Sequence, residues 1–165
     1  MLVPPITEQH TAELAAVYAD HQVARYIGGA ALDVDGTAAQ VSRFEAVWQD
    51  HGFGQSALID RRTGAFLGRA GLHPWPHWGE VELGYVLARH AQGRGLATEA
   101  AVAWLAVASG RLGLERLTAV IHPENAPSRA LATRLGFRLH RQDVTPAGVP
   151  VLVHEWFSAA GGPVG

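Results

Sequence analysis

The 165-residue sequence contains no cysteine. This absence excludes disulfide bonds, thiolate metal sites and catalysis by a cysteine nucleophile. Charged residues make up only 17% of the chain, and a net charge of -2 leaves no excess of positive charge for non-specific binding to nucleic acid. We therefore expect no direct contact with nucleic acid and a reducing, cytoplasmic setting.

Long apolar runs are also missing. The most apolar segment, Leu96 to Ala108, contains Thr98 and Glu99 and is too short to cross a bilayer. The first residues, Met1 to Pro5, lack the basic start and the long apolar stretch of a secretory signal. These absences predict a chain that makes no use of a membrane.

The length corresponds to about one domain, and no internal repeat or linker divides the chain. We expect a single domain over residues 1–158 and a flexible, Gly-rich tail over 159–165.

Hydrophobic periodicity divides the chain into two parts. Apolar residues at helical spacing predict three helices in the first third, starting at Thr7 and over 20–27 and 37–50. Strand patterns follow over 53–60, 65–72, 81–87, 114–121, 137–144 and 149–157, with helices over 95–108 and 125–135 and a loop over 73–78. Hairpins imply antiparallel neighbours, and the strand–helix–strand unit implies one parallel pair. The sequence thus predicts an α/β fold with a mixed, mostly antiparallel sheet flanked by helices.

The segment Gln92-Gly93-Arg94-Gly95-Leu96-Ala97-Thr98 lies between a predicted strand and a predicted helix. A helix N-terminus offers unpaired N–H groups and partial positive charge, and neighbouring glycines let a phosphate approach the backbone. The loop therefore predicts a site for a phosphorylated ligand, although a purely structural turn would use the same glycines. A P-loop lysine is absent, and Thr98 stands where a Rossmann fingerprint needs its third glycine.

Four motifs resemble those of the GNAT N-acetyltransferase family. Gln92-x-x-Gly95-x-Ala97 is similar to its pyrophosphate motif, and Glu82-x-Gly84-Tyr85 is similar to the strand pattern of its RimJ/RimL-type branch. Asn125-x-x-Ser128 and Leu135-Gly136-Phe137 complete the set in the family's order. The chain departs from this branch at Leu2-Val3-Pro4, where the branch usually has arginine in place of Val3.

The resemblance implies acetyl-coenzyme A as co-substrate, held without a metal between two splayed parallel strands. It implies that backbone groups on one strand bind the pantetheine arm, that the glycine loop binds the pyrophosphate, and that Asn125 contacts the arm. The residues expected to bind the cofactor are Tyr85, Val86, Leu87, Gln92, Gly93, Arg94, Gly95, Leu96, Ala97, Thr98, Asn125 and Ser128.

The resemblance also implies direct attack of an amine on the thioester, with a strand N–H near Val86 as oxyanion hole. Glu82 is the expected general base and Ser128 the expected general acid. Two simpler interpretations stay open at this point. Glu82 can be a solvated strand residue or an ion-pair partner, and Asn125 is in any case a good helix N-cap.

The acceptor side is expected to include Tyr26 and the aromatic loop residues His73, Trp75 and His77. The acceptor itself can be a protein N-terminus or a small amine, and the protein a monomer or a homodimer. Two alternative functions of the same fold are an acyltransferase that uses another acyl-CoA and a non-catalytic acyl-CoA-binding sensor or scaffold.

Overall fold

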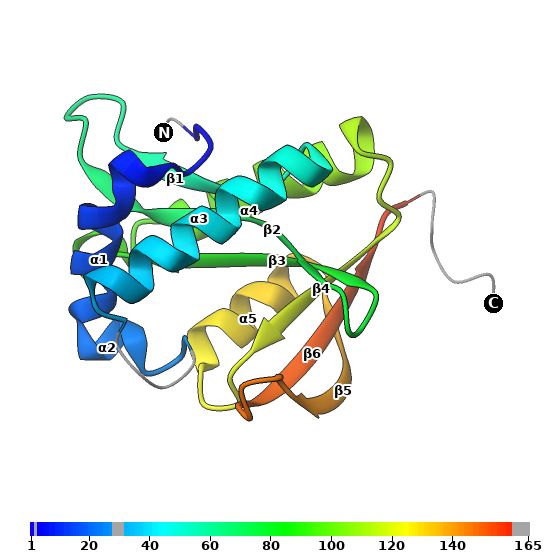
Figure 1. The fold of residues 1–165 in the computed structure, drawn as a ribbon. Coiled ribbons are helices and arrows are strands. Elements are labelled where there is room, and N and C mark those ends of the chain that lie inside the picture. The colour runs from blue at the N-terminus through cyan, green and yellow to red at the C-terminus, as the bar shows by residue number, and fades with distance from the viewer. Residues whose placement is uncertain (2, 28–31, 160–165) are drawn as a thin grey trace.

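The computed structural model describes residues 1, 3–27 and 32–159. Its centre is a six-stranded sheet in the order β1-β2-β3-β4-β6-β5 (Figure 1). Only the β3–β4 pair is parallel among these strands, and the other neighbours are antiparallel. The predicted mixed sheet is therefore confirmed. The strands are β1 (Gln55–Ile59), β2 (Phe66–Trp75), β3 (Glu80–Leu87), β4 (Arg116–Ile121), β5 (Arg138–Val144) and β6 (Pro150–Phe157).

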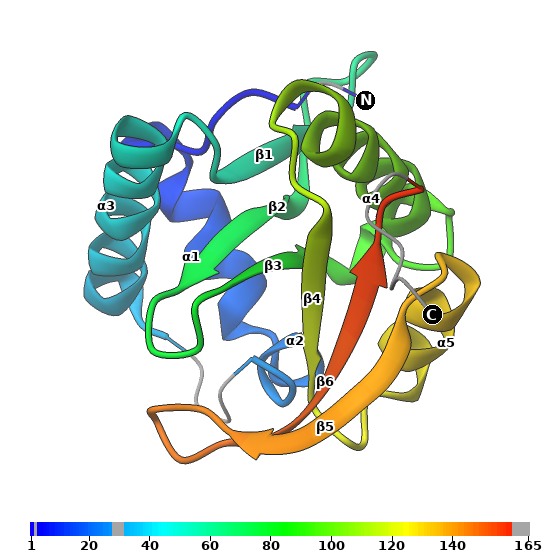
Figure 2. The same cartoon turned by 90° about the vertical axis from the view of Figure 1, so that its right-hand side faces the viewer.

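Helices cover both faces of the sheet. Figure 2 shows α1 (Thr11–Ala19) and α3 (Val34–His51) on one side and α4 (Leu96–Ala106) and α5 (Ala126–Arg134) on the other. A short α2 (His21–Ala24) follows α1. The predicted helix end at Gly28-Gly29 and the tail from residue 160 lie outside the described residues.

The helix starts follow from local capping. Asp33 precedes α3, and its carboxylate accepts a hydrogen bond from the Gly36 N–H at 2.7 Å. The chain after Thr7 begins with a 3₁₀ turn over Glu8–His10, in which the Thr7 N–H donates to His10 Nδ1 at 3.1 Å. Histidine thus takes the place that glutamate usually holds in a capping box.

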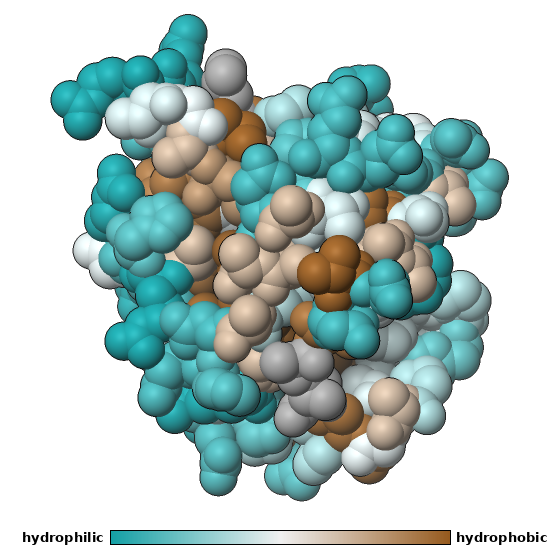
Figure 3. Space-filling view, turned by 60° about the vertical axis from the view of Figure 1, so that its left-hand side comes forward, coloured by the Kyte–Doolittle hydropathy of each residue, from teal (hydrophilic) through white to brown (hydrophobic). Residues whose placement is uncertain are grey.

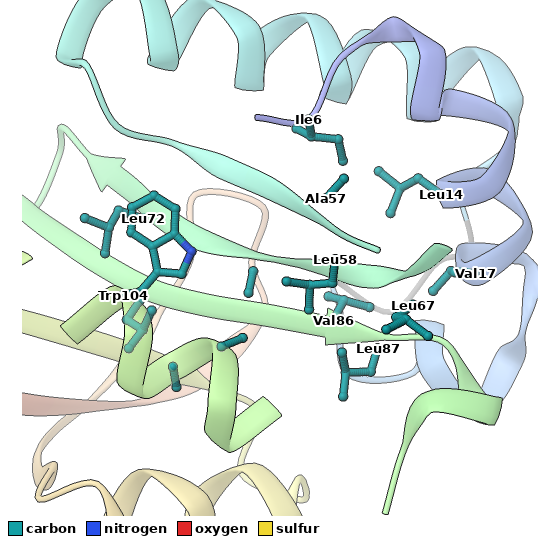
Figure 4. Close-up of a cluster of buried hydrophobic side chains, with 14 of the residues drawn as sticks. Ile6, Leu14, Val17, Ala57, Leu58, Leu67, Leu72, Val86, Leu87 and Trp104 are labelled. Atoms are coloured by element: carbon teal, nitrogen blue, oxygen red, sulfur yellow. The ribbon is translucent and has the colours of Figure 1, made fainter. Parts of the chain in front are cut away.

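The hydrophobic core lies on both faces of the sheet (Figure 4). Ile6, Leu14 and Ala57 are fully buried between β1 and α1, and Leu72 is fully buried on the side of α4, near Trp104. The residues before α1 also pair with the edge of the sheet, because the Ala57 N–H donates to the Pro4 carbonyl at 2.8 Å.

Several predicted boundaries were wrong; the third helix, for example, begins at Val34 and not at residue 37. β2 continues through Pro74 to Trp75, so His73 and Trp75 lie in a strand and not in a loop. Proline is tolerated because β1 pairs with β2 only as far as Gly71, so the ring at Pro74 interrupts no ladder. The helix after the glycine loop ends at Ala106 and continues as a π-helical turn over Val107–Arg111.

On the face that Figure 3 shows, apolar residues gather at the upper left and in the centre, and hydrophilic side chains surround them. Within the described ranges, no helix has both the length and the apolar character needed to cross a membrane.

Candidate active site

The sheet opens between its two parallel strands. β3 and β4 are paired only at Glu82↔Thr118, whereas β2 and β3 are paired along all of β3. In Figure 1, β3 and β4 run at an angle to each other and end apart. The remainder of β3, from Leu83 to Leu87, therefore has no ladder with β4 among the described residues. An extended ligand could pair with this edge as an added strand.

Strand alternation identifies the free backbone groups. The Ala88 N–H donates to the Leu67 carbonyl at 2.9 Å, so even-numbered residues of β3 direct their backbone groups toward β2. The Val86 backbone is therefore engaged by β2, and the backbone groups of Tyr85 and Leu87 face the opening. The Leu87 carbonyl accepts a hydrogen bond from the Gln92 side chain at 3.1 Å. At Leu87, therefore, the backbone N–H is the group that can still bind a ligand.

The glycine loop follows the open edge directly. Gly93 and Gly95 have φ angles of 71° and 77°, in the left-handed region that favours glycine, and Gly95 is the N-cap of α4. The N–H groups of Leu96, Ala97 and Thr98 belong to the first turn of this 11-residue helix. This arrangement suits a phosphate group. Arg94 lies at its rim, 3.9 Å from the Asp60 carboxylate.

Glu82 stands at the last paired position before the opening. The indole N–H of Trp75 donates to Glu82 Oε2 at 2.7 Å. Burial raises the pKa of the Glu82 carboxyl, while the Trp75 N–H, the charge of Arg69 and the Val120 backbone N–H oppose this rise. A half-buried carboxyl with a raised pKa at a strand opening has the properties of a general base.

Three of the four predicted acceptor-side residues lie together. The ring centroids of His73 and His77 are 5.0 and 5.5 Å from that of Trp75, and His73 pairs directly with Glu82 across the sheet. Burial, together with the charges of Arg69 and Arg43, lowers the pKa of His73 to about 4, so it is neutral at pH 7. Tyr26 is not part of this cluster. Its ring lies 5.7 Å from the ring of His122, the residue that follows β4.

The proposed acid side lies on the opposite face of β3. The Tyr85 hydroxyl donates to Ser128 Oγ at 3.0 Å, which links β3 to α5. Burial raises the pKa of Tyr85. Asn125 caps α5 by accepting the Ser128 N–H at 3.2 Å, as its N-cap interpretation predicts. Candidate base and candidate acid therefore approach the opening from its two sides.

Arg69 was not among the predicted site residues, although it is buried, with 8% of the residue exposed. Its guanidinium donates to the Tyr18 hydroxyl at 2.6 Å and to Gln55 Oε1 at 2.8 Å, both neutral acceptors. Arg69 and His73 are an even number of residues apart on β2, so both side chains lie on the same face of the sheet as Glu82. This spacing is the sequence feature that could have identified Arg69 as a site residue.

A family model described as "Acetyltransferase (GNAT) domain" matches residues 1–138. The chain belongs to the GNAT acetyltransferase family. The family match supports acetyl transfer in general and leaves the acceptor unspecified.

Individual proteins are similar to this chain in sequence or in fold. The uncharacterized protein YkkB of Bacillus subtilis is 33% identical over 110 residues, which cover 64% of this chain and 63% of YkkB. An acetyltransferase from Agrobacterium tumefaciens has the same fold, with a TM-score of 0.83 and 27% identity over 94% of this chain and 90% of its own. The yncA protein of Salmonella typhimurium, solved with its cofactor acetyl-CoA, has a TM-score of 0.71 and 20% identity over 95% and 93% of the two chains.

Proposed function

We propose that this GNAT protein transfers an acetyl group from acetyl-CoA to a primary amine, on a protein N-terminus or a small molecule, by direct attack. One observation carries the proposal: the β3–β4 ladder ends at Glu82, and the open edge leads into the glycine-turned N-terminus of α4. The open edge of β3 can pair with the amide groups of the pantetheine arm, and the N-terminus of α4 can hold the phosphates. Along the chain these two features lie next to each other, as the arm and the pyrophosphate do in acetyl-CoA. The yncA structure supports the same ligand.

The cofactor contacts follow from the free groups. The N–H and carbonyl of Tyr85 and the N–H of Leu87 would bind the arm, and one of these N–H groups would polarise the thioester carbonyl. Because the backbone of Val86 is engaged by β2, we propose no such contact for it. The N–H groups from Gly93 to Thr98 would hold the pyrophosphate, with Arg94 as an added charge.

The chemistry needs no covalent acetyl-enzyme. The amine nitrogen attacks the thioester carbon, so an N–C bond forms, the C–S bond breaks and the products are an amide and free CoA. Glu82 accepts the proton that the amine loses. Ser128, hydrogen-bonded to the Tyr85 hydroxyl, gives a proton to the leaving thiolate, and the proton that Glu82 took from the amine returns to the serine oxygen through solvent. We further propose a RimJ/RimL-type branch on the strength of the Glu82-x-Gly84-Tyr85 and Asn125-x-x-Ser128 motifs, a single domain over 1–158 and a cytoplasmic location.

Ligand-induced stabilisation tests the cofactor. Acetyl-CoA at about one hundred times its dissociation constant should add roughly 2.7 kcal/mol of stability, a Tm rise of about 5–11 °C for a chain of this size. NAD and ATP should give no comparable shift. If they stabilise the protein and acetyl-CoA does not, the cofactor assignment is wrong.

A matched pair of glycine variants localises the site. Gly95 and Gly148 have φ angles of 77° and 81°, and a Cβ at either position meets no atom within 4 Å. Alanine should therefore strain both backbones similarly, by about 1–2 kcal/mol. Only Gly95→Ala should weaken acetyl-CoA binding. An amine screen read by released thiol then tests turnover, because the cysteine-free chain contributes no signal. Binding without turnover of any amine would favour the sensor alternative.

A further inference from the structure

The Glu82 carboxylate has two oxygens in different surroundings. Oε2 accepts the Trp75 indole N–H at 2.7 Å from the neighbouring strand. Oε1 lies over Gly84, because a Cβ built on Gly84 would be only 3.2 Å from it. The Trp75 hydrogen bond thus fixes the position of Oε2. Oε1 can lie over residue 84 because glycine has no side chain there.

The space beside Oε1 is free of side chains from two adjacent strands. Gly84 is paired with Gly71 across β2 and β3, between the pairs His73↔Glu82 and Arg69↔Val86. Since cross-strand pairs share a face, neither glycine places a side chain next to the carboxylate, and a Cβ built on Gly71 would lie only 2.1 Å from the Gly54 carbonyl oxygen. Tyr85, whose backbone faces the β4 opening, is the next residue along β3.

We propose that Trp75 and Gly84 are positioning residues that together present a single oxygen of Glu82, Oε1, to the acceptor amine. The indole N–H occupies Oε2, and Gly84 leaves room for Oε1 beside the open strand edge. This inference rests on the proposed function, in which Glu82 is the base. It gives Trp75 a role that differs from the expected one, a wall of the acceptor pocket.

The charges around Glu82 are compatible with this role. Arg69 and His73 of β2 lie on the same side of the sheet as Glu82, and the Val120 N–H of β4 also interacts with its carboxylate. The charge of Arg43 on α3 contributes to the lowered pKa of His73. His73 is neutral at pH 7, so it does not repel an incoming cationic amine. The Trp75 N–H is one of the groups that lower the Glu82 pKa against the effect of burial.

Trp75→Phe keeps an aromatic ring and removes the N–H. We expect kcat at pH 7 to fall about tenfold, because the carboxylate loses its fixed orientation. The Glu82 pKa should rise further, so the acidic limb of the kcat/KM profile should move to higher pH. Affinity for acetyl-CoA should be unchanged. Trp78→Phe is the control, since its ring lies 5.1 Å from that of Trp75 and, among the described contacts, no hydrogen bond joins Trp78 to Glu82.

Gly84→Ala tests the other oxygen and keeps the proposal testable if Trp75→Phe fails to fold. The new methyl group would lie 3.2 Å from Oε1 and require it to shift by a few tenths of an ångström, so we expect a loss of kcat of up to about tenfold with acetyl-CoA affinity retained. Gly110→Ala, where a Cβ meets nothing within 4 Å, is the control.

Glu82→Gln separates the two possible failures. If Glu82→Gln retains full activity, the base assignment fails, and the positioning proposal fails with it. If Glu82→Gln loses activity while Trp75→Phe keeps the wild-type kcat and pH profile and Gly84→Ala keeps the wild-type kcat, only the positioning proposal is refuted.

Discussion

A charged cluster at the closed end of the β3–β4 opening provides a test of how the sheet is held together. Glu80 begins β3, and its side chain is only 5% exposed. Arg141 of β5 binds it through both carboxylate oxygens, at 2.8 and 3.1 Å, and Arg116 of β4 binds it at 2.9 Å. The β3–β4 ladder joins the two halves of the sheet by a single residue pair, Glu82↔Thr118. The ion pairs of Glu80 with Arg116 and Arg141 therefore provide a second connection between β3 and the strands β4 and β5.

We predict that Arg141→Met destabilises the fold by roughly 2–3 kcal/mol. Removing one partner of a buried ion pair usually costs about 3–5 kcal/mol, and Arg116 remains here to satisfy part of the Glu80 charge. For a chain of this size the Tm should fall by about 4–12 °C. Arg138→Met, on the same strand but exposed, should change stability by less than about 0.5 kcal/mol.

The pH dependence of stability gives an independent measure. Although burial opposes it, the hydrogen bonds and charges of Arg141 and Arg116 lower the Glu80 pKa overall. A carboxyl whose pKa is lower when folded stabilises the protein above its unfolded pKa, and this stabilisation is lost as pH falls through the folded value. Thermal melts between pH 3 and 7 should therefore show a weaker acid dependence in Arg141→Met than in wild type. A variant with wild-type Tm and wild-type acid dependence would refute this role for the cluster.

Two further predictions concern the acid side and the core. Tyr85→Phe removes the hydrogen bond to Ser128 and should lower kcat by about tenfold in steady-state assays, with the Tm changed by only a few degrees; an unchanged kcat would exclude Tyr85 from proton supply. Leu58→Ala, at a fully buried position, should cost about 2–5 kcal/mol in chemical denaturation, whereas Val34→Ala, at a 61% exposed position, should cost under 1 kcal/mol. Similar losses in both would contradict the observed core.

The sequence predicted those features that depend on neighbours along the chain. Periodicity located the strands around the opening, and the glycines at 93 and 95 marked the turn into α4. The end of β2 was misjudged because Pro74 reads as a loop signal. Only the three-dimensional position of β1 shows that this proline interrupts no hydrogen-bonded ladder.

Contacts between distant residues could not be predicted in the same way. Arg141 and Glu80 are 61 positions apart, and nothing local indicates that their side chains meet. The Trp75–Glu82 bond spans only seven positions, but it requires the hairpin register that pairs His73 with Glu82. Likewise, the assignment of free N–H groups to Tyr85 and Leu87 follows from the ladder and not from the motif.

The most direct test of the account measures Glu82→Gln with both ligands. Calorimetry should give the same acetyl-CoA affinity as wild type, because the side chain lies on the acceptor side of β3. The pH profile of kcat/KM, taken with an amine found in the screen, should lose its acidic limb, and kcat should fall by about 10²–10⁴-fold. Wild-type turnover with an unchanged acidic limb would contradict the assignment of Glu82 as the base at the β3–β4 opening.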